Sequence, residues 1–444
     1  MATDRMIRLW AFLLLGLFGA GVQAMEPIQH WVTANGARVY FVPAPEIPMV
    51  DLRVVFDAGS ARDGGKAGLA RMTAALLDQG AGGRSADEIA AAFDAVGARL
   101  DIGSLRDMAW VGLRTLTDAK AFEPALATWI DVLTRPDFNE RDFERERERR
   151  LVGLEHDRQR PARIAEKAYY RALYRDHPYA SPPGGTVESI KALTRDDLRA
   201  FHRRYYVARN AVVAIVGDLD RAAAEALAER MVEGLPAGEP APALPPVPPL
   251  EAAKVEVIDH PSTQTHILMG QPGMARKDPD YFRLYVGNYI LGGGGLVSRL
   301  NQEVREQRGL SYSVYSYFSP MQVAGPFTLG LQTRNDQAAE ALAVVRETLG
   351  KFLDEGPTRK EMEAAIKHIT GGHALRIDSN GKILEYLGVI GFYGLPLDYL
   401  ETFNEKIEAV TLEEVVDAFR RRVHPERMVT VQVGRNGAAA EGGR

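Results

Sequence analysis

The 444-residue chain contains no cysteine, and this absence excludes several classes of function at once. Without thiols the protein has no disulfide framework, no cysteine nucleophile, no cysteine-ligated zinc and no iron–sulfur cluster. A lipid anchor attached to an N-terminal cysteine is excluded for the same reason. No excess of one charge is present either, because 54 Lys and Arg face 59 Asp and Glu, a net charge of −5. This balance argues against a basic nucleic-acid surface and against an acidic tail. The length and the 46% hydrophobic content predict a globular protein of several units.

The first 24 residues have the features of a secretory signal peptide. Arg5 and Arg8 precede an apolar run over residues 9–22, and the residues at −3 and −1 of a cleavage point after Ala24 are small. The run has 14 residues, which is short of the ~20 that a membrane-spanning helix needs. An uncleaved anchor is the alternative. We therefore expect residues 1–24 to be removed and the mature protein to be periplasmic, without a membrane anchor.

A proline-rich segment lies near the middle of the mature chain. From Pro236 to Pro249, seven of fourteen residues are proline. Proline fixes φ and lacks a backbone donor, so this segment is expected to form neither a helix nor a central strand. We expect an extended linker of up to ~43 Å at ~3.1 Å per residue. It would join a first half, residues 25–235, to a second half, residues 250–444.

A repeat with an offset of 217 residues relates the two halves. Residues 188–217 align with residues 405–434 without a gap, and nine of the thirty positions are identical. In each copy a threonine, Thr194 or Thr411, precedes acidic residues in a first helical turn, and basic residues follow in the last turn. A β-branched run closed by glycine comes next. We infer that the two halves are homologous.

The pattern of each half predicts an α+β fold, with strands followed by helices and a final strand. Strands are expected at 38–42, 50–56, 99–102, 109–116, 211–216, 254–258, 265–271, 312–318, 326–333 and 428–433. Helices are expected at 69–77, 86–96, 118–134, 140–157, 281–291, 296–306, 337–353 and 358–375.

This order of elements resembles the pitrilysin family of zinc peptidases, which includes insulin-degrading enzyme and the mitochondrial processing peptidases. The resemblance covers nearly all of the mature chain and includes the segments 54–60, 68–70 and 84–89. It implies two homologous α+β halves in a clamshell arrangement, each a mostly antiparallel sheet with helices packed on it. In catalytic members an early helix carries His-x-x-Glu-His, in which two His bind Zn²⁺ and Glu activates water. At that place this chain has Arg71-Met-Thr-Ala-Ala75, without either His or the Glu.

The remaining histidines do not replace this motif. The nine His lie at positions 30, 156, 177, 202, 260, 266, 368, 373 and 424. His368 and His373 are five residues apart and would diverge by roughly 140° on a helix. Glu155 matches the place of the family's distal zinc ligand, although a solvated or salt-bridged helix residue is the alternative. We expect no metal site and no cofactor in this chain.

A second family motif is intact. Arg305-Glu-Gln-Arg-Gly-Leu-Ser-Tyr312 resembles the family segment that supplies an arginine and a tyrosine seven residues apart. The resemblance implies that Arg305 and Tyr312 donate hydrogen bonds to the carbonyl oxygen on which charge develops during peptide hydrolysis, and to the adjoining peptide backbone. The alternative is that Arg305 ends a helix and Tyr312 packs as a strand aromatic.

A glycine run precedes that motif, at Gly292, Gly293, Gly294 and Gly295. It is not a phosphate-binding loop, because no Gly-Lys-Ser or Gly-Lys-Thr follows. The resemblance implies a loop that lets the backbone of a substrate or partner come close. A helix-breaking turn without a binding role is the alternative.

These features together predict a noncatalytic, substrate-binding subunit of a heterodimeric, exported zinc metallopeptidase. The zinc would belong to a homologous partner that carries His-x-x-Glu-His, and this chain alone would have no independent peptidase activity. The alternative is an inert scaffold or a peptide-binding protein of the same fold, possible also as a homodimer. No nucleic-acid partner is expected.

Overall fold

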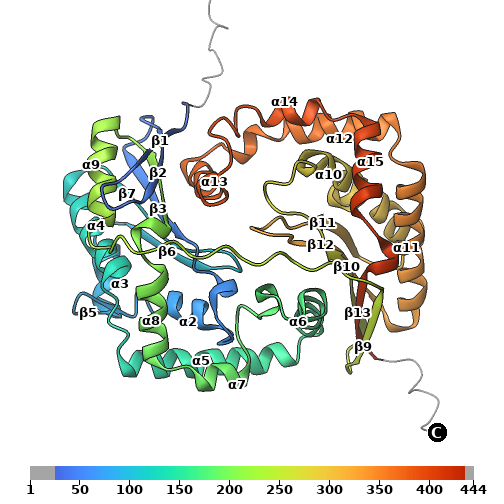
Figure 1. Ribbon diagram of the computed structural model, residues 1–444, viewed down its shortest axis with the longest axis horizontal. Helices are drawn as coiled ribbons and strands as arrows, with labels where there is room; N and C mark the ends of the chain where they lie inside the picture. The colour runs from blue at the N-terminus through green and yellow to red at the C-terminus, as the bar shows by residue number, and fades with distance from the viewer. Residues whose placement is uncertain (1–25, 436–444) are drawn as a thin grey trace, which may run out of the picture.

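The computed structural model describes residues 26–435, and the expected signal peptide therefore lies outside the described residues. Two α+β halves face each other like the shells of a clam, with the N-terminal half on the left and the C-terminal half on the right of Figure 1. Among residues 26–435, no helix combines the length and the apolar character needed to cross a membrane.

The strands form one large sheet in each half. The first sheet has the order β1-β2-β8-β3-β7-β6 and the second has the order β11-β12-β10-β13-β9. Their strands are β1 (Gln29–Val32), β2 (Arg38–Pro43), β3 (Met49–Phe56), β6 (Arg99–Ser104), β7 (Ala109–Leu116), β8 (Ala211–Gly217), β9 (Lys254–Asp259), β10 (Gln264–Pro272), β11 (Ser313–Phe318), β12 (Pro326–Arg334) and β13 (Val429–Gly434), and a small hairpin pairs β4 (Gly80–Ala81) with β5 (Arg84–Ser85). The strand of each sheet that comes last in the sequence pairs with two neighbours. Strand β8 is parallel to β2 and antiparallel to β3, and β13 is parallel to β9 and antiparallel to β10. All other pairings are antiparallel, as expected.

The helices cover the outer faces of the sheets and line the interior. They are α2 (Leu69–Ala75), α3 (Ala86–Asp94), α4 (Ala119–Thr134), α5 (Glu140–Arg158), α6 (Pro161–Tyr174), α7 (Val187–Ala192), α8 (Arg195–Tyr205), α9 (Arg221–Val232), α10 (Tyr281–Asn288), α11 (Ala338–Glu355), α12 (Arg359–Gly371), α13 (Asn380–Tyr393), α14 (Phe403–Glu408) and α15 (Leu412–Arg422).

The repeat seen in the sequence corresponds to repeated structure. Helices α8 and α15 begin and end at positions exactly 217 residues apart, and each is followed by the strand at the same place in its sheet. Both helices begin with a capping box, Thr194 with Asp197 and Thr411 with Glu414, which satisfies otherwise unpaired N–H groups of the first turn.

The halves exchange one helix each. Helix α6 of the N-terminal half packs on β10 and β13 of the other sheet, and α13 of the C-terminal half packs on β8 and β3. An offset of 217 places α6 almost on α13, so the exchanged helices are equivalent. Contact is close enough to require glycine at Gly270, where a Cβ would lie 2.2 Å from the Tyr169 hydroxyl, and at Gly391, where it would lie 2.4 Å from Val212 Cγ1. The two halves therefore share one packed junction.

Residues 236–249 contain no helix or strand, as the proline content predicts. The segment runs across the middle of the molecule in Figure 1 and is fixed along its length. Its carbonyls accept hydrogen bonds from Ala208 N at Pro236 (2.9 Å) and from Arg204 Nη1 at Glu239 (2.8 Å). His177 Nε2 contacts the Pro245 carbonyl at 3.0 Å. These contacts fix the linker to the N-terminal half.

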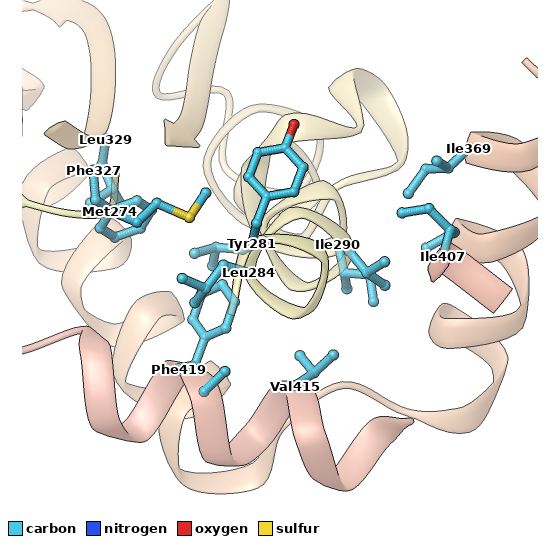
Figure 2. Packing of buried hydrophobic residues seen from close by; sticks show 14 of the residues in the cluster. Met274, Tyr281, Leu284, Ile290, Phe327, Leu329, Ile369, Ile407, Val415 and Phe419 are labelled. Atoms are coloured by element: carbon cyan, nitrogen blue, oxygen red, sulfur yellow. The ribbon is translucent and has the colours of Figure 1, made fainter. Parts of the chain in front are cut away.

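The core of the C-terminal half surrounds α10. Figure 2 shows Leu284 and Ile290 directed toward α15, α12 and α14, while Tyr281 points away from α15 and Met274 lies beside Phe327 and Leu329 of β12. Buried residues on both sides of α10 fix its position and its direction. Since α10 leads directly into the glycine run, this packing also positions that loop.

Two expected helices differ from the structure in this region. The helix predicted over 281–291 is α-helical only to Asn288 and continues as a π-helical turn, Tyr289–Gly293. The helix predicted over 296–306 is a 3₁₀ turn, Gly295–Val297, followed by a π-helical segment, Asn301–Glu306. A third difference lies elsewhere in the C-terminal half: the helix expected over 358–375 ends at Gly371. π-Helical turns are frequent at functional sites. Here one of them includes Gly292 and Gly293, and the other follows the glycine run.

Candidate functional site

The glycine run forms the wall of a cavity, and its members are not equivalent. Gly292 is buried, and a Cβ there would lie 2.4 Å from Ser316 Oγ and 2.5 Å from Ser316 N. Ser316 is held in turn by a hydrogen bond of 2.8 Å from its hydroxyl to Asn288 Oδ1. At Gly295, by contrast, a Cβ would meet no atom within 4 Å, and φ is +62°. Gly292 therefore allows the loop to pack on β11, and Gly295 allows the backbone to turn.

Arg305 and Tyr312 lie on the two sides of the turn that joins the second π-helical segment to β11. Gly309 N donates to the Arg305 carbonyl at 2.9 Å, and Gly309 has a φ of +61°, which sets the turn. The Tyr312 side chain is 89% exposed and precedes the first residue of β11, so it is not packed as a strand aromatic. Arg305 is partly exposed and its Nε lies 3.5 Å from a Glu306 carboxylate oxygen. Neither side chain is engaged in the core.

The predicted residues converge on a single cavity of about 850 Å³. Arg305, Tyr312, Gly292, Gly293 and Gly295 all line it, whereas Gly294 does not. Four further tyrosines also line it, Tyr281 and Tyr285 of α10 and Tyr315 and Tyr317 of β11. We call this the glycine-loop cavity. It offers a guanidinium and a phenol as donors beside a loop without side chains, a surface suited to an extended polypeptide.

The segment at the family's metal motif does form a helix, α2, but it carries no metal ligand. Arg71 is exposed at its start, while Ala74 and Ala75 offer only methyl groups. Buried Asp63 caps the helix and accepts hydrogen bonds of 2.8 Å from Gly68 N and Ala70 N. Burial raises the pKa of Asp63 to about 7, although these two N–H groups act in the opposite direction. A guanidinium and two methyl groups do not fit a zinc ion.

The other candidate ligands are dispersed. Glu155 lies on the solvent side of α5 and pairs with Arg158 at 3.4 Å, which agrees with the salt-bridged alternative. Buried His202 and His373 contact main-chain carbonyls, Leu133 O and Leu400 O. Within residues 26–435, no group of three or more His, Asp or Glu is arranged to hold a metal ion.

The sequence did not predict one cationic feature of this region. On α5, Arg150 and not Glu155 faces α2, and its Nε donates to the Gly184 carbonyl at 2.6 Å. Arg150 lines a cavity with Arg71 and Lys167. The only sequence signal was the substitution at position 71 itself, since the charged run 140–150 resembles an ordinary solvated helix.

The chain forms a clamshell of two α+β halves that exchange one helix each, and the helix at the metal motif carries no metal ligand. These features define a peptidase-type fold with an altered site. Comparison with known proteins agrees. Residues 38–187 match the model of the insulinase family, peptidase family M16, and residues 192–369 match that of the peptidase M16 inactive domain. A protein named "uncharacterized zinc protease" from Streptomyces coelicolor is 30% identical over 83% of this chain and 81% of its own length. The chain belongs to peptidase family M16.

Two further relatives bear on the altered site. The non-peptidase homolog YmxG of Helicobacter pylori is 25% identical over 91% of this chain and 93% of its own length. The crystal structure of a peptidase M16 inactive domain from Pseudomonas fluorescens is 40% identical, with a TM-score of 0.89, and covers 92% of this chain and 98% of its own. This chain is therefore similar to members described as inactive as well as to members described as zinc proteases.

Proposed function

We propose that this protein is the noncatalytic, substrate-binding subunit of a heterodimeric zinc metallopeptidase that acts after export to the periplasm. The zinc would lie in a homologous partner chain that carries His-x-x-Glu-His. The observation that carries this proposal is the combination of two sites in one chain. The metal-motif helix has lost its ligands, while Arg305, Tyr312 and three glycines of the loop still line one cavity.

The exposure of the cavity rim supports a role in contact with another molecule. Tyr312, Leu296 and Val297 are large hydrophobic side chains, and each is more than half exposed. Leu296 and Tyr312 line the cavity, and Val297 is the next residue of the 3₁₀ turn that ends the glycine run. Apolar side chains gathered at one rim are typical of a binding surface.

In the proposed complex, the chemistry is divided between the chains. The partner's metal would supply the activated water. This chain would supply two donors, the Tyr312 phenol and the Arg305 guanidinium, at the peptide carbonyl where negative charge develops. The glycine loop would hold the peptide backbone. Since both donors are free of core contacts, they can turn toward a partner's site without disturbing the fold.

A titration with the zinc-bearing homologue tests the proposal. The two chains are expressed separately, and hydrolysis of a quenched fluorescent peptide is measured as this chain is added to a fixed amount of the partner. We expect turnover to rise and then to saturate at an equimolar ratio, while this chain alone shows no turnover. No rise in turnover with any homologue that carries the zinc motif would contradict the proposal.

The second candidate is an inert scaffold or a peptide-binding protein that works as a homodimer, and the name of the Helicobacter pylori relative favours it. The mass of the purified protein in solution, alone and with the homologue, separates the two. A stable homodimer that does not exchange subunits with the homologue favours the second candidate.

A further inference from the structure

A second cavity lies where the family has its metal, and its walls are strongly cationic. It has a volume of about 250 Å³ and is formed by α2, α5, α6 and the segment around Gly184. Five cationic side chains and two carboxylates line it, a net charge of +3: Arg71, Arg106, Arg150, Arg163 and Lys167 against Asp157 and Glu166. We call this the basic cavity.

Most of the positive charge of the basic cavity is not neutralised by carboxylates. Only Arg163 has a close partner, with 2.8 Å from its Nη1 to Glu166 Oε2. Arg150 Nη2 lies 3.9 Å from Asp157 Oδ2. Arg71 and Lys167 make no hydrogen bond or ion pair with any residue of the described chain. Two cations are thus left to face the cavity without a partner.

The remaining arginine of the cavity is fixed by neutral groups. Arg106 Nη1 donates to the carbonyls of Tyr179 (3.1 Å) and Ser181 (2.7 Å). Its guanidinium carbon lies 3.5 Å from the centre of the Tyr170 ring. A stacked guanidinium with neutral acceptors keeps its full charge and is held in place. The cavity therefore has a rigid cation beside its unpaired ones.

The cations of the basic cavity also oppose one another. Burial lowers the pKa of Arg150, and the charges of Arg71 and Arg163 lower it further. Burial likewise lowers the pKa of Lys167, and the charge of Arg150 adds to this effect, while Asp157 acts in the opposite direction on both groups. Like charges held together are costly, and a bound anion would relieve that cost.

The basic cavity lies at one end of a row of three cavities. It shares Glu166 and Tyr170 with a middle cavity of about 420 Å³, between α6 and the strands β11 and β12. That middle cavity shares Ser313, Tyr315 and Tyr317 with the glycine-loop cavity. The row therefore extends from the unpaired cations of one half to Arg305 and Tyr312 of the other.

We propose that the basic cavity binds a carboxylate of the peptide whose backbone lies in the middle and glycine-loop cavities. This inference rests on the proposed peptide-binding function. Arg71 and Lys167 supply positive charge where the family has its metal ion. Such side chains attract an anion, but they do not activate a water molecule as a metal ion does. The carboxylate would come from an acidic side chain or from the C-terminus of the peptide.

Peptide binding with matched variants tests the inference. The probe is an N-terminally dansylated decapeptide of alternating Ala and Ser with one Glu, compared with its Gln counterpart, each with a free or an amidated C-terminus; the dansyl label carries no carboxylate. We expect the full-length protein to bind carboxylate-bearing peptides about 10-fold or more tighter than the neutral one, as charge-assisted hydrogen bonds favour. Comparing the Glu and the free-terminus probes identifies which carboxylate is bound.

The variant for this test is the double substitution Arg71→Ala and Lys167→Met, because neither side chain has a partner in the fold. It should remove the preference and leave the affinity for the neutral peptide unchanged. The control is the double substitution Arg149→Ala and Lys120→Met, which likewise removes two positive charges, at exposed side chains that do not line the cavity (Arg149 is 79% exposed). Equal binding of all probes, or a preference that survives the double substitution, overturns the inference while leaving peptide binding in place. If no probe binds at all, the proposed peptide-binding function fails together with it.

Discussion

The Tyr393 hydroxyl of the C-terminal half donates a hydrogen bond of 3.0 Å to the Asp107 carboxylate of the N-terminal half. Asp107 is buried and also accepts from the Tyr179 hydroxyl at 2.5 Å and from Gln322 N at 2.8 Å. Burial raises the pKa of Asp107, whereas these three donors favour its charged form. Two of the donors come from the opposite half, so the carboxylate joins the two halves at their junction.

Removing one donor at this junction should weaken the whole molecule. We expect Tyr393→Phe to lower the free energy of unfolding by about 1–3 kcal/mol, because the buried carboxylate keeps its position but loses a hydrogen bond. Denaturant unfolding followed by tryptophan fluorescence measures the change. Tyr205→Phe, at a partly buried tyrosine of α8 with no hydrogen-bonded hydroxyl, is the control. An equal loss in both variants would mean that the contact with Asp107 contributes nothing.

The glycine at position 292 should be needed for packing. In Gly292→Ala the new Cβ would meet the backbone nitrogen of Ser316 at 2.5 Å, so the loop or β11 must move. We expect a loss of about 1–3 kcal/mol, the usual cost of overpacking. Gly350→Ala in α11 is the matched control, since a Cβ there meets nothing within 4 Å and alanine favours a helix. Thermal unfolding of the two variants should therefore shift in opposite directions.

Buried His202 should make the protein sensitive to mild acid. Burial lowers the pKa of His202 to about 4, while its Nε2 donates to the Leu133 carbonyl at 3.2 Å. In the unfolded chain the same group has a pKa of about 6.5. The unfolded state therefore binds more protons between these values, and the stability that the neutral ring provides is lost as the pH falls from about 6.5 to about 4. The full effect is roughly 3 kcal/mol.

The measurement is the free energy of unfolding at pH 7 and at pH 4.5. His202→Gln keeps a donor for Leu133 and should lose less stability over this range than the unsubstituted protein. His156→Gln, at an exposed position of α5, should behave like the unsubstituted protein. An unchanged pH dependence in His202→Gln would show that other groups cause the acid sensitivity.

The features that the sequence predicted are those that depend on neighbouring residues. Thr194 and Thr411 each start a helix because a capping box needs only residues three apart, and both helices were expected at the positions found. The exchange of α6 and α13 could not be predicted, since it depends on contacts such as Tyr169 with Phe327, 158 residues apart. π-Helical turns also have no local sequence signal, which explains the two altered helices around the glycine run.

The candidate site, too, could be predicted only where it depends on neighbouring residues. The resemblance of residues 305–312 to the family segment, and not the spacing alone, was the basis for proposing Arg305 and Tyr312 as a pair, and the structure brings both to one cavity with Gly292, Gly293 and Gly295. Their role in a partner's site stays a prediction. The basic cavity needs Arg71 beside Arg150 and Lys167, residues from three helices, and only the folded chain brings them together.

The last prediction separates the two donors of the proposed site. In a complex with the zinc-bearing homologue, Tyr312→Phe removes a hydroxyl from a side chain that is 89% exposed and has no packing role. We expect peptide turnover to fall by about 10²-fold, the low end of the loss caused by removing one donor to a developing oxyanion. Arg305→Ala should reduce turnover and also raise KM, because the guanidinium would hold the peptide backbone as well. Arg308→Ala is the control for the local change in charge, because Arg308 lies between the two donors in the sequence, pairs with Glu303 and does not line the cavity. Assembly is measured by mass in solution for every variant, and a loss of turnover explained by a loss of assembly would remove the catalytic role assigned to Tyr312.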